Sequence, residues 1–337
     1  MKFQKSSAFS ITLLTLVAAP ALTACTSDAS ESIDPNLAEQ VTALSSCTAH
    51  HRIDFNGNGT TDFAVFRQTT GQWFNVQSPN AVFGVAGQLD IPVAEDYDGD
   101  CKADHAYWNP STGTWNVRLS STGATVSQQW GSASLGDIPS PGDYDGDEKT
   151  DFAVFRQSTG QWFIIQSSNG ISNSVFGVAG EQDVPVPGDY DGDGKTDRAY
   201  WAPATGTWNL RFSSNGTTTT HVWGLGSVGD VPVPGDYDGD GKTDLAVFRQ
   251  PTGQWFTIRS STGAVQNLVF GVAGQVDIPV PGDYDGDGKT DPAYWNPVSG
   301  TWNVRFADNT TTSQQWGSSA VGDIPLPAPP AYILSHF

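Results

Sequence analysis

The sequence predicts an all-β protein, folded as a β-propeller of six four-stranded blades, and three observations lead to this prediction. An acidic nine-residue loop occurs six times, starting at Asp54, Asp96, Asp143, Asp189, Asp236 and Asp283. Successive starts are 42, 47, 46, 47 and 47 residues apart, a spacing typical of one propeller blade. Between loops, short aromatic and β-branched runs alternate with Gly, Pro, Asn and Ser, which is enough for about four strands a unit. A seven-bladed ring is the alternative, but it needs a further unit.

Each loop carries side-chain oxygens at positions 1, 3, 5 and 9, which is the pattern of a calcium site. The copy from Asp189 to Asp197 reads Asp-Tyr-Asp-Gly-Asp-Gly-Lys-Thr-Asp. Carboxylates at these positions, with the backbone carbonyl of position 7, suit a hard divalent cation. Glycine at position 6 permits the positive φ that turns the chain around the ion. We expect three to six Ca²⁺ ions; acidic turns without metal are the alternative.

The expected metal ligands follow from these positions, with the lysines contributing backbone carbonyls. They are Asp54, Asn56, Asn58 and Asp62; Asp96, Asp98, Asp100, Lys102 and Asp104; Asp143, Asp145, Asp147, Lys149 and Asp151; Asp189, Asp191, Asp193, Lys195 and Asp197; Asp236, Asp238, Asp240, Lys242 and Asp244; and Asp283, Asp285, Asp287, Lys289 and Asp291.

Three of the six loops depart from the pattern. The first has Asn56 and Asn58 in place of aspartates, so it carries less charge and should bind more weakly. The second and third have Cys101 and Glu148 where the turn glycine is expected. We expect the lysine side chain at position 7 to lie in solvent in each loop that has one.

The charge of the chain is concentrated in these loops. The formal net charge is −20, and the six loops hold 22 aspartates and Glu148, that is 23 of the 36 acidic residues. Carboxylates packed this closely repel one another without metal, so we expect folding and calcium binding to be coupled. The acidic balance makes nucleic acid an improbable partner.

The N-terminal segment predicts export. Lys2 and Lys5 precede an apolar stretch from Ile11 to Ala21, too short to span a membrane as a helix. The run Leu22-Thr-Ala-Cys25 resembles the lipobox of bacterial lipoproteins, which implies lipidation of Cys25; an ordinary secretory signal is the alternative. We therefore expect a lipoprotein signal peptide over 1–24, a tether over 25–50 with a short helix from Pro35 to Leu44, and the propeller over 51–337.

Localisation and disulfide pairing follow from export. More than one acyl chain gives a stable membrane anchor, and Thr26 and Ser27 after the cysteine favour the outer membrane. The oxidising compartment allows Cys47 and Cys101 to form a disulfide, although the sequence alone leaves this pairing open.

Two kinds of unit alternate along the chain. One reads Ala-Val-Phe-Arg, then Thr-Gly-Gln-Trp-Phe, then Phe-Gly-Val-Ala-Gly; the other reads Ala-Tyr-Trp, then Thr-Gly-Thr-Trp, then Trp-Gly. The Asp-Ile-Pro-Val-Pro segments before the loops suit edge strands, because proline cannot donate to a sheet ladder. The last such segment has no loop after it. We expect Ile324–Leu334 to pack beside the first unit and close the ring.

The run from Phe270-Gly271 through Asp277-Ile-Pro-Val-Pro-Gly to Asp283-Tyr-Asp-Gly-Asp-Gly-Lys-Thr-Asp291 resembles the FG-GAP/VCBS repeats of integrin α subunits and exported bacterial proteins. The resemblance covers about residues 50–327. It implies a propeller with calcium held in a loop of each blade, acting as a binding or adhesion module for a protein or a glycan.

Repeated aromatic and basic residues leave two further readings of function open. Nine of the twelve tryptophans lie in the second kind of unit. Packing between strands is the favoured reading, and glycan platforms at Trp108, Trp201 and Trp295, as in a lectin, are the alternative. The repeated arginines, Arg67, Arg156 and Arg249 in one kind of unit and Arg118, Arg211 and Arg305 in the other, are expected to stack on aromatic rings, and contact with an anion or a glycan is the alternative. The histidines form no catalytic pattern, so we expect no enzyme; a calcium-dependent polysaccharide lyase is the third alternative.

Overall fold

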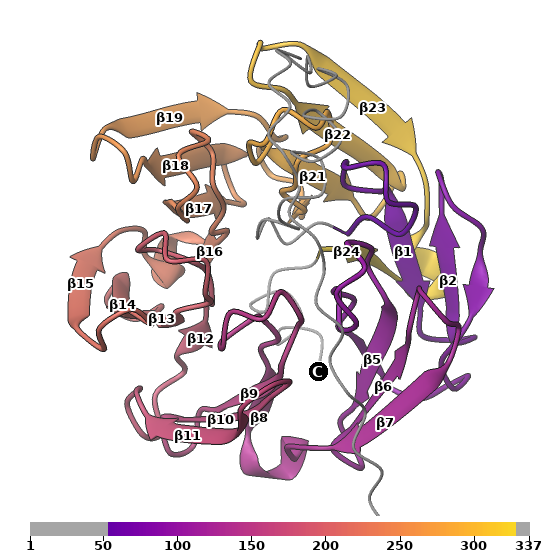
Figure 1. Ribbon diagram of the computed structural model, residues 1–337. Helices are drawn as coiled ribbons and strands as arrows, with labels where there is room; N and C mark the ends of the chain where they lie inside the picture. The colour runs from indigo at the N-terminus through magenta and orange to yellow at the C-terminus, as the bar shows by residue number, and fades with distance from the viewer. Residues whose placement is uncertain (1–52, 328–337) are drawn as a thin grey trace, which may run out of the picture. The chain divides into compact units, whose positions relative to one another are not determined.

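A computed structural model describes residues 53–327 of the protein, and these residues form six four-stranded antiparallel sheets arranged in a ring (Figure 1). The ring confirms the predicted propeller of six blades. Within residues 53–327, no helix is long and apolar enough to cross a membrane.

Each blade takes its strands from one stretch of chain, except for the first. Blade 1 holds β24 (Asp323–Leu326), β1 (Ala64–Arg67), β2 (Gln72–Asn75) and β3 (Ala81–Val82); blade 2 holds β4 (Ile91–Pro92), β5 (His105–Asn109), β6 (Thr114–Arg118) and β7 (Thr125–Gln129); blade 3 holds β8 (Asp137–Pro139), β9 (Phe152–Arg156), β10 (Gln161–Gln166) and β11 (Gly170–Val175).

The second half of the ring repeats this order. Blade 4 holds β12 (Val184–Pro185), β13 (Arg198–Ala202), β14 (Thr207–Arg211) and β15 (Thr218–Val222); blade 5 holds β16 (Asp230–Pro232), β17 (Leu245–Arg249), β18 (Gln254–Ile258) and β19 (Val265–Val269); blade 6 holds β20 (Ile278–Pro279), β21 (Ala293–Asn296), β22 (Thr301–Arg305) and β23 (Thr311–Gln315). Single 3₁₀ turns, η1 (Ala133–Leu135), η2 (Gly226–Val228) and η3 (Ser319–Val321), precede β8, β16 and β24.

The last strand closes the ring on the first blade. In β24, Asp323 pairs with Arg67 of β1 and Leu326 pairs with Ala64, in antiparallel register. The arginine side chain also donates to the Asp323 carboxylate at 2.6 Å and 3.0 Å. The closure predicted for Ile324–Leu334 is confirmed as far as residue 327, beyond which the chain lies outside the described residues.

The innermost strand of every sheet carries the proline-rich segment, as predicted. An edge strand pairs on one side only, so the missing N–H of proline costs no ladder bond. The short strand β12, for example, pairs with β13 through Val184 opposite Trp201 and Pro185 opposite Tyr200. Five of the six inner strands, β4, β8, β12, β16 and β20, lead directly into acidic loops and thereby hold these loops at the same end of the ring. The loop from Asp54 to Asp62 joins them there through the hydrogen bond from Thr61 N–H to the carbonyl oxygen of Asp283 at 2.7 Å.

Tryptophans fill the space between neighbouring sheets. Trp201 and Trp208 face each other across β13 and β14, and both indole N–H groups donate to the carbonyl oxygen of Trp223, at 3.1 Å and 3.0 Å. Trp223 in turn donates to the carbonyl oxygen of Phe256 in blade 5, at 3.1 Å. One aromatic cluster therefore packs blade 4 and ties it to the next blade.

Candidate metal centres

Three carboxylates converge in each of five acidic loops. The loops are numbered by blade: loop 1 is 54–62, loop 2 is 96–104, loop 3 is 143–151, loop 4 is 189–197, loop 5 is 236–244 and loop 6 is 283–291. In loops 2 to 6, one oxygen from each of positions 1, 3 and 9 lies within 4.8 Å of the others. The groups are Asp96, Asp98 and Asp104; Asp143, Asp145 and Asp151; Asp189, Asp191 and Asp197; Asp236, Asp238 and Asp244; and Asp283, Asp285 and Asp291.

The position-1 carboxylate organises the loop backbone. In loop 4, Asp189 Oδ1 accepts the N–H of Gly192 at 2.6 Å, and Oδ2 accepts that of Gly194 at 2.8 Å. Both glycines have φ near +80°, a conformation that L side chains rarely adopt. Cys101 and Glu148 adopt the same left-handed conformation at position 6 of loops 2 and 3, with φ of 67° and 65°. The loop shape is therefore kept where glycine is absent.

A pair of serines from the next hairpin holds the other carboxylates, and sequence reasoning missed it. In blade 4, Asp197 Oδ1 accepts the N–H of Ser213 at 2.6 Å, while the Ser213 hydroxyl donates to Asp193. The hydroxyl of Ser214 donates to Asp191 Oδ2 at 2.5 Å. Equivalent pairs are Ser120-Ser121, Ser167-Ser168 and Ser260-Ser261. Their fixed distance from each loop is the sequence signal that could have revealed them.

One oxygen in four loops is buried without any hydrogen-bond partner. It is Oδ1 of the position-3 carboxylate, in Asp98, Asp145, Asp191 and Asp238. A buried carboxylate oxygen without a donor is costly, because no polar group replaces the water it has lost. Its place beside the carboxylates of positions 1 and 9 is what a bound divalent cation would explain. By this test, the residues of these loops fit a calcium ion.

Positions 5 and 7 are placed differently. The position-5 carboxylate stands outside the group of three, since Asp193 Oδ1 accepts the N–H of Lys195 at 3.0 Å and a hydrogen bond from Ser213. The carbonyl oxygen of Lys195 accepts no hydrogen bond within residues 53–327. It is therefore free to serve as the position-7 ligand that the sequence predicts.

Loop 1 is closed by its own amides. Asn56 Nδ2 donates to Asp62 Oδ1 at 2.8 Å, and Asn58 Oδ1 accepts the N–H of Thr60 at 3.0 Å. The position-3 amide thus supplies a donor to position 9, where the other loops bring two carboxylates together. This contact gives loop 1 an internal substitute for a cation.

Neighbouring loops are joined through positions 1 and 8. The N–H of Thr243 in loop 5 donates to the carbonyl oxygen of Asp189 in loop 4 at 2.7 Å, and the same bond occurs between every pair of adjacent loops. The position-7 lysines are not simply in solvent, which corrects the prediction. Lys195 reaches back over Gly146 of loop 3, and its Nζ donates to the carbonyl oxygen of Asp145 at 2.9 Å.

Burial raises the pKa of the carboxyl group at position 9 in every loop. The pKa of Asp197 rises to about 6, that of Asp151 to about 7 and that of Asp291 to about 8. Desolvation is the largest cause, and the other carboxylates of the loop add to it. A cation that binds these carboxyl groups in their ionised form would therefore stabilise the loops.

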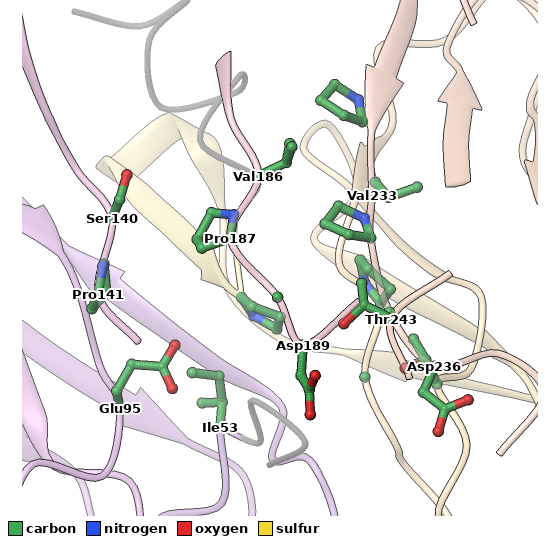
Figure 2. Close-up of a pocket in the computed structure, with 18 of the residues that line it drawn as sticks. Ile53, Glu95, Ser140, Pro141, Val186, Pro187, Asp189, Val233, Asp236 and Thr243 are labelled. Atoms are coloured by element: carbon green, nitrogen blue, oxygen red, sulfur yellow. The ribbon is translucent and has the colours of Figure 1, made fainter. Parts of the chain in front are cut away.

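The acidic loops border a central pocket of about 230 Å³, lined by inner-strand residues of all six blades. Figure 2 shows proline rings and valines, among them Pro141, Val186 and Val233, around the pocket, with Asp189 and Asp236 at its rim. Proline and valine side chains have little conformational freedom to lose, so the pocket is pre-formed.

The three tryptophans considered as glycan platforms are buried. Trp108, Trp201 and Trp295 are 1%, 2% and 0% exposed, so no indole face is open to a sugar ring. This burial corrects the platform alternative and supports packing. The arginines of the first kind of unit behave as expected, because Arg67, Arg156 and Arg249 lie over Phe74, Phe163 and Phe256 at 4.3 Å, 4.4 Å and 4.7 Å from the ring centroids. Within residues 53–327, Arg118, Arg211 and Arg305 make no such contact, so the stacking prediction is wrong for the second kind of unit.

Several predictions fall on residues that the structure does not describe. The signal peptide over 1–24, the lipidated Cys25, the tether over 25–50 and Cys47 all lie outside residues 53–327. Cys101 is disulfide-bonded. Its pairing with Cys47 stays a prediction.

Comparison with known proteins places the repeat and the fold. Residues 236–291, which include loops 5 and 6, match the FG-GAP-like repeat family. No curated protein matches the chain in sequence. Virginiamycin B lyase from Staphylococcus aureus has a similar structure, with 10% identity, a TM-score of 0.52 and coverage of 82% of this chain and 88% of the lyase. An Agrocybe aegerita lectin that recognises non-reducing terminal N-acetylglucosamine is similar with 13% identity, a TM-score of 0.51 and coverage of 79% of both chains. At these identities the likeness concerns the fold alone.

Proposed function

We propose that this six-bladed β-propeller, which matches the FG-GAP-like repeat over residues 236–291, is a calcium-stabilised, lipid-anchored binding module of the bacterial cell envelope. Calcium would be held in loops 2 to 6, giving five ions, while loop 1 does without one. The observation that carries the calcium assignment is the buried, unpartnered position-3 oxygen beside two further carboxylates in loops 2 to 5. Loop 6 is included because Asp283, Asp285 and Asp291 form the same group of three carboxylates.

Bound calcium would supply positive charge where these carboxylates crowd. The chain's own residues do the rest. Position 1 shapes each loop through backbone N–H groups. In loops 2 to 5, position 3 also keeps one oxygen free, and the serine pair orients positions 3, 5 and 9. Backbone hydrogen bonds between adjacent loops connect these ordered loops around the ring. A rigid ring then presents the same surface to its partner at every encounter, which lowers the entropy lost on binding.

Metal binding is tested by dialysing the purified protein against calcium and counting bound ions by mass spectrometry, beside thermal unfolding in calcium and in EDTA. We expect five ions and a rise in melting temperature with calcium. Magnesium is the control, because it demands octahedral geometry and keeps its waters, so it should stabilise far less. Absence of both bound calcium and a melting shift would overturn the metal assignment.

The anchor and the partner need separate tests. Labelled fatty acid should be incorporated into the wild-type protein and not into a Cys25→Ser variant. Calcium-dependent capture on a glycan array would identify a glycan partner, and capture of envelope proteins with an empty array would identify a protein partner. Release of unsaturated sugars would instead support the lyase alternative.

A further inference from the structure

Each blade has a second buried aspartate, at the opposite end of the inner strand from its acidic loop. The six are Asp90, Asp137, Asp183, Asp230, Asp277 and Asp323, all of them buried. In each, Oδ2 accepts the backbone N–H of the residue five positions earlier, as Asp183 does from Val178 at 3.2 Å. The other oxygen, Oδ1, faces the side chain paired with it on the second strand.

In blades 1, 3 and 5 that partner is a guanidinium group. Arg67, Arg156 and Arg249 donate through Nε to Oδ1 at 2.6 Å, 2.6 Å and 2.7 Å, and through a second nitrogen to Oδ2. This is the two-pronged geometry in which guanidinium and carboxylate fit best.

In blades 2 and 6 the partner is an amide. Asn109 Nδ2 donates to Asp90 Oδ1 at 2.8 Å, and Asn296 Nδ2 donates to Asp277 Oδ1 at 2.9 Å. The same amides also donate to the side-chain oxygens of Gln88 and Gln275. Five of the six buried carboxylates are therefore satisfied by a donor from the neighbouring strand.

Blade 4 lacks this donor. Ala202 occupies the position of Asn109 and Asn296, and Glu181 occupies that of the two glutamines. Asp183 is 1% exposed, and its Oδ1 accepts no hydrogen bond within residues 53–327. Burial, with Glu181 as a second cause, raises the pKa of Asp183. The exposed Glu181 adds a negative charge that blades 2 and 6 do not have. Blade 4 thus combines a carboxylate oxygen that has no donor, on a side chain that is almost fully buried, with a missing amide and a second acid.

We propose that Asp183, Glu181 and Ala202 form a binding site for a guanidinium group carried by a ligand. The ligand's N–H groups would take the place that arginine fills in blades 1, 3 and 5, with Asp183 as the buried acceptor and Glu181 as the counter-ion at the entrance. A guanidinium group suits the site better than a metal ion, because two carboxylates supply too few oxygens for calcium. It suits the site better than an amide, because Glu181 adds charge. The site goes beyond the proposed function and is independent of calcium in the loops at the other end of β12 (Figure 1).

The probe is methylguanidine, titrated calorimetrically into the whole protein in saturating calcium at neutral pH. The tripeptide Gly-Arg-Gly, used in parallel, separates a small guanidino ligand from an arginine on a peptide: equal affinity assigns recognition to the group itself, and tighter peptide binding assigns it to a peptide partner.

Two variants test the assignment. Ala202→Asn installs the amide that blades 2 and 6 already carry, and it should weaken methylguanidine binding at least about tenfold by satisfying Asp183 internally. Glu181→Gln changes an exposed side chain without threatening the fold, and it should weaken binding by a factor of about two to five. Asn109→Ala is the matched control, because it opens the same gap in blade 2 and should add a second, weaker site. No measurable binding to the wild-type protein, or unchanged affinity in Ala202→Asn, would overturn the proposal.

Discussion

The backbone N–H of Thr61 donates to the carbonyl oxygen of Asp283 at 2.7 Å, which joins position 8 of the first acidic loop to position 1 of the last. With the equivalent bonds between the other loops, it completes a circle of six around the central pocket. Position 1 is also the residue whose carboxylate organises its own loop. The conformation of each loop is therefore coupled through position 1 to the conformation of its neighbours.

Exchanging Asp191 for asparagine should remove one calcium ion without loss of the fold. Loop 1 provides the precedent, since Asn56 donates to Asp62 there at 2.8 Å. An amide at position 191 can donate to Asp197 in the same way and relieves the repulsion between the two carboxylates. We expect four bound ions rather than five, and a melting temperature in EDTA equal to or above that of the wild type.

The reciprocal variant, Asn56→Asp, is the control. It should raise the number of ions by one and lower the melting temperature in EDTA. Ion counts that stay at the wild-type value in both variants would show that position 3 is not a ligand.

The metal-free protein should lose stability as the pH rises from about 4 to 8. The pKa of Asp104 and Asp151 is raised to about 7 by burial and that of Asp291 to about 8, from 3.8. Between these values the folded protein holds protons that the unfolded chain has released, so the free energy of unfolding falls with rising pH. Calcium binds the ionised form, so its stabilising effect should increase over the same range.

Thermal unfolding at pH 5 and pH 8, in EDTA and in calcium, checks this prediction. In EDTA the melting temperature should be higher at pH 5, and the gain on adding calcium should be larger at pH 8. A metal-free protein that is more stable at pH 8 than at pH 5 would contradict the assigned cause.

The repeat period and the loop spacing were enough to predict blade number, strand content and the place of the prolines, because these features depend on local sequence. Contacts between distant segments were not predictable in this way. The hydroxyl of Ser214 reaches Asp191 from a separate hairpin, and Lys195 packs over Gly146 in the preceding blade. The burial of Trp201 likewise depends on which strand faces the next sheet. The hydrogen bond by which Asn56 closes loop 1 could have been predicted from the sequence, because an amide can donate a hydrogen bond where a carboxylate cannot.

Replacing Arg67 by methionine should destabilise the closing blade by about 3 kcal/mol, because it leaves the carboxylate of Asp323 buried and unpaired. The Arg67 side chain is 26% exposed and that of Asp323 is fully buried. Removing both charges, in Arg67→Met with Asp323→Leu, should restore most of the loss. Denaturant unfolding measures both values.

Arg156→Met is the matched control, since the same ion pair lies within the single stretch of chain that forms blade 3. It should cost a similar free energy. Only the Arg67 variant should also speed hydrogen exchange in β24, and equal exchange of β24 in both variants would argue against a special role in closure.

Alanine substitutions at two glycines of blade 4 can distinguish the effect of backbone strain from that of close packing. Gly206 and Gly216 have nearly the same φ, 70° and 71°, so alanine at either position carries a similar conformational cost of about 1 kcal/mol. A Cβ at Gly216 would meet nothing within 4 Å, whereas one at Gly206 would lie 1.8 Å from the carbonyl oxygen of Gly224. The Thr-Gly turn therefore packs directly on the Trp-Gly pair that recurs in these units.

We expect Gly216→Ala to fold with a small loss of stability, measured by denaturant unfolding. Gly206→Ala should cost several times more or fail to fold, because the new Cβ would collide with the backbone of Gly224. The two backbone segments cannot separate without breaking the hydrogen bond from Trp223 N–H to the carbonyl oxygen of Gly206 at 2.7 Å. Equal losses in the two variants would mean that conformational strain alone, and not this contact, fixes glycine at position 206.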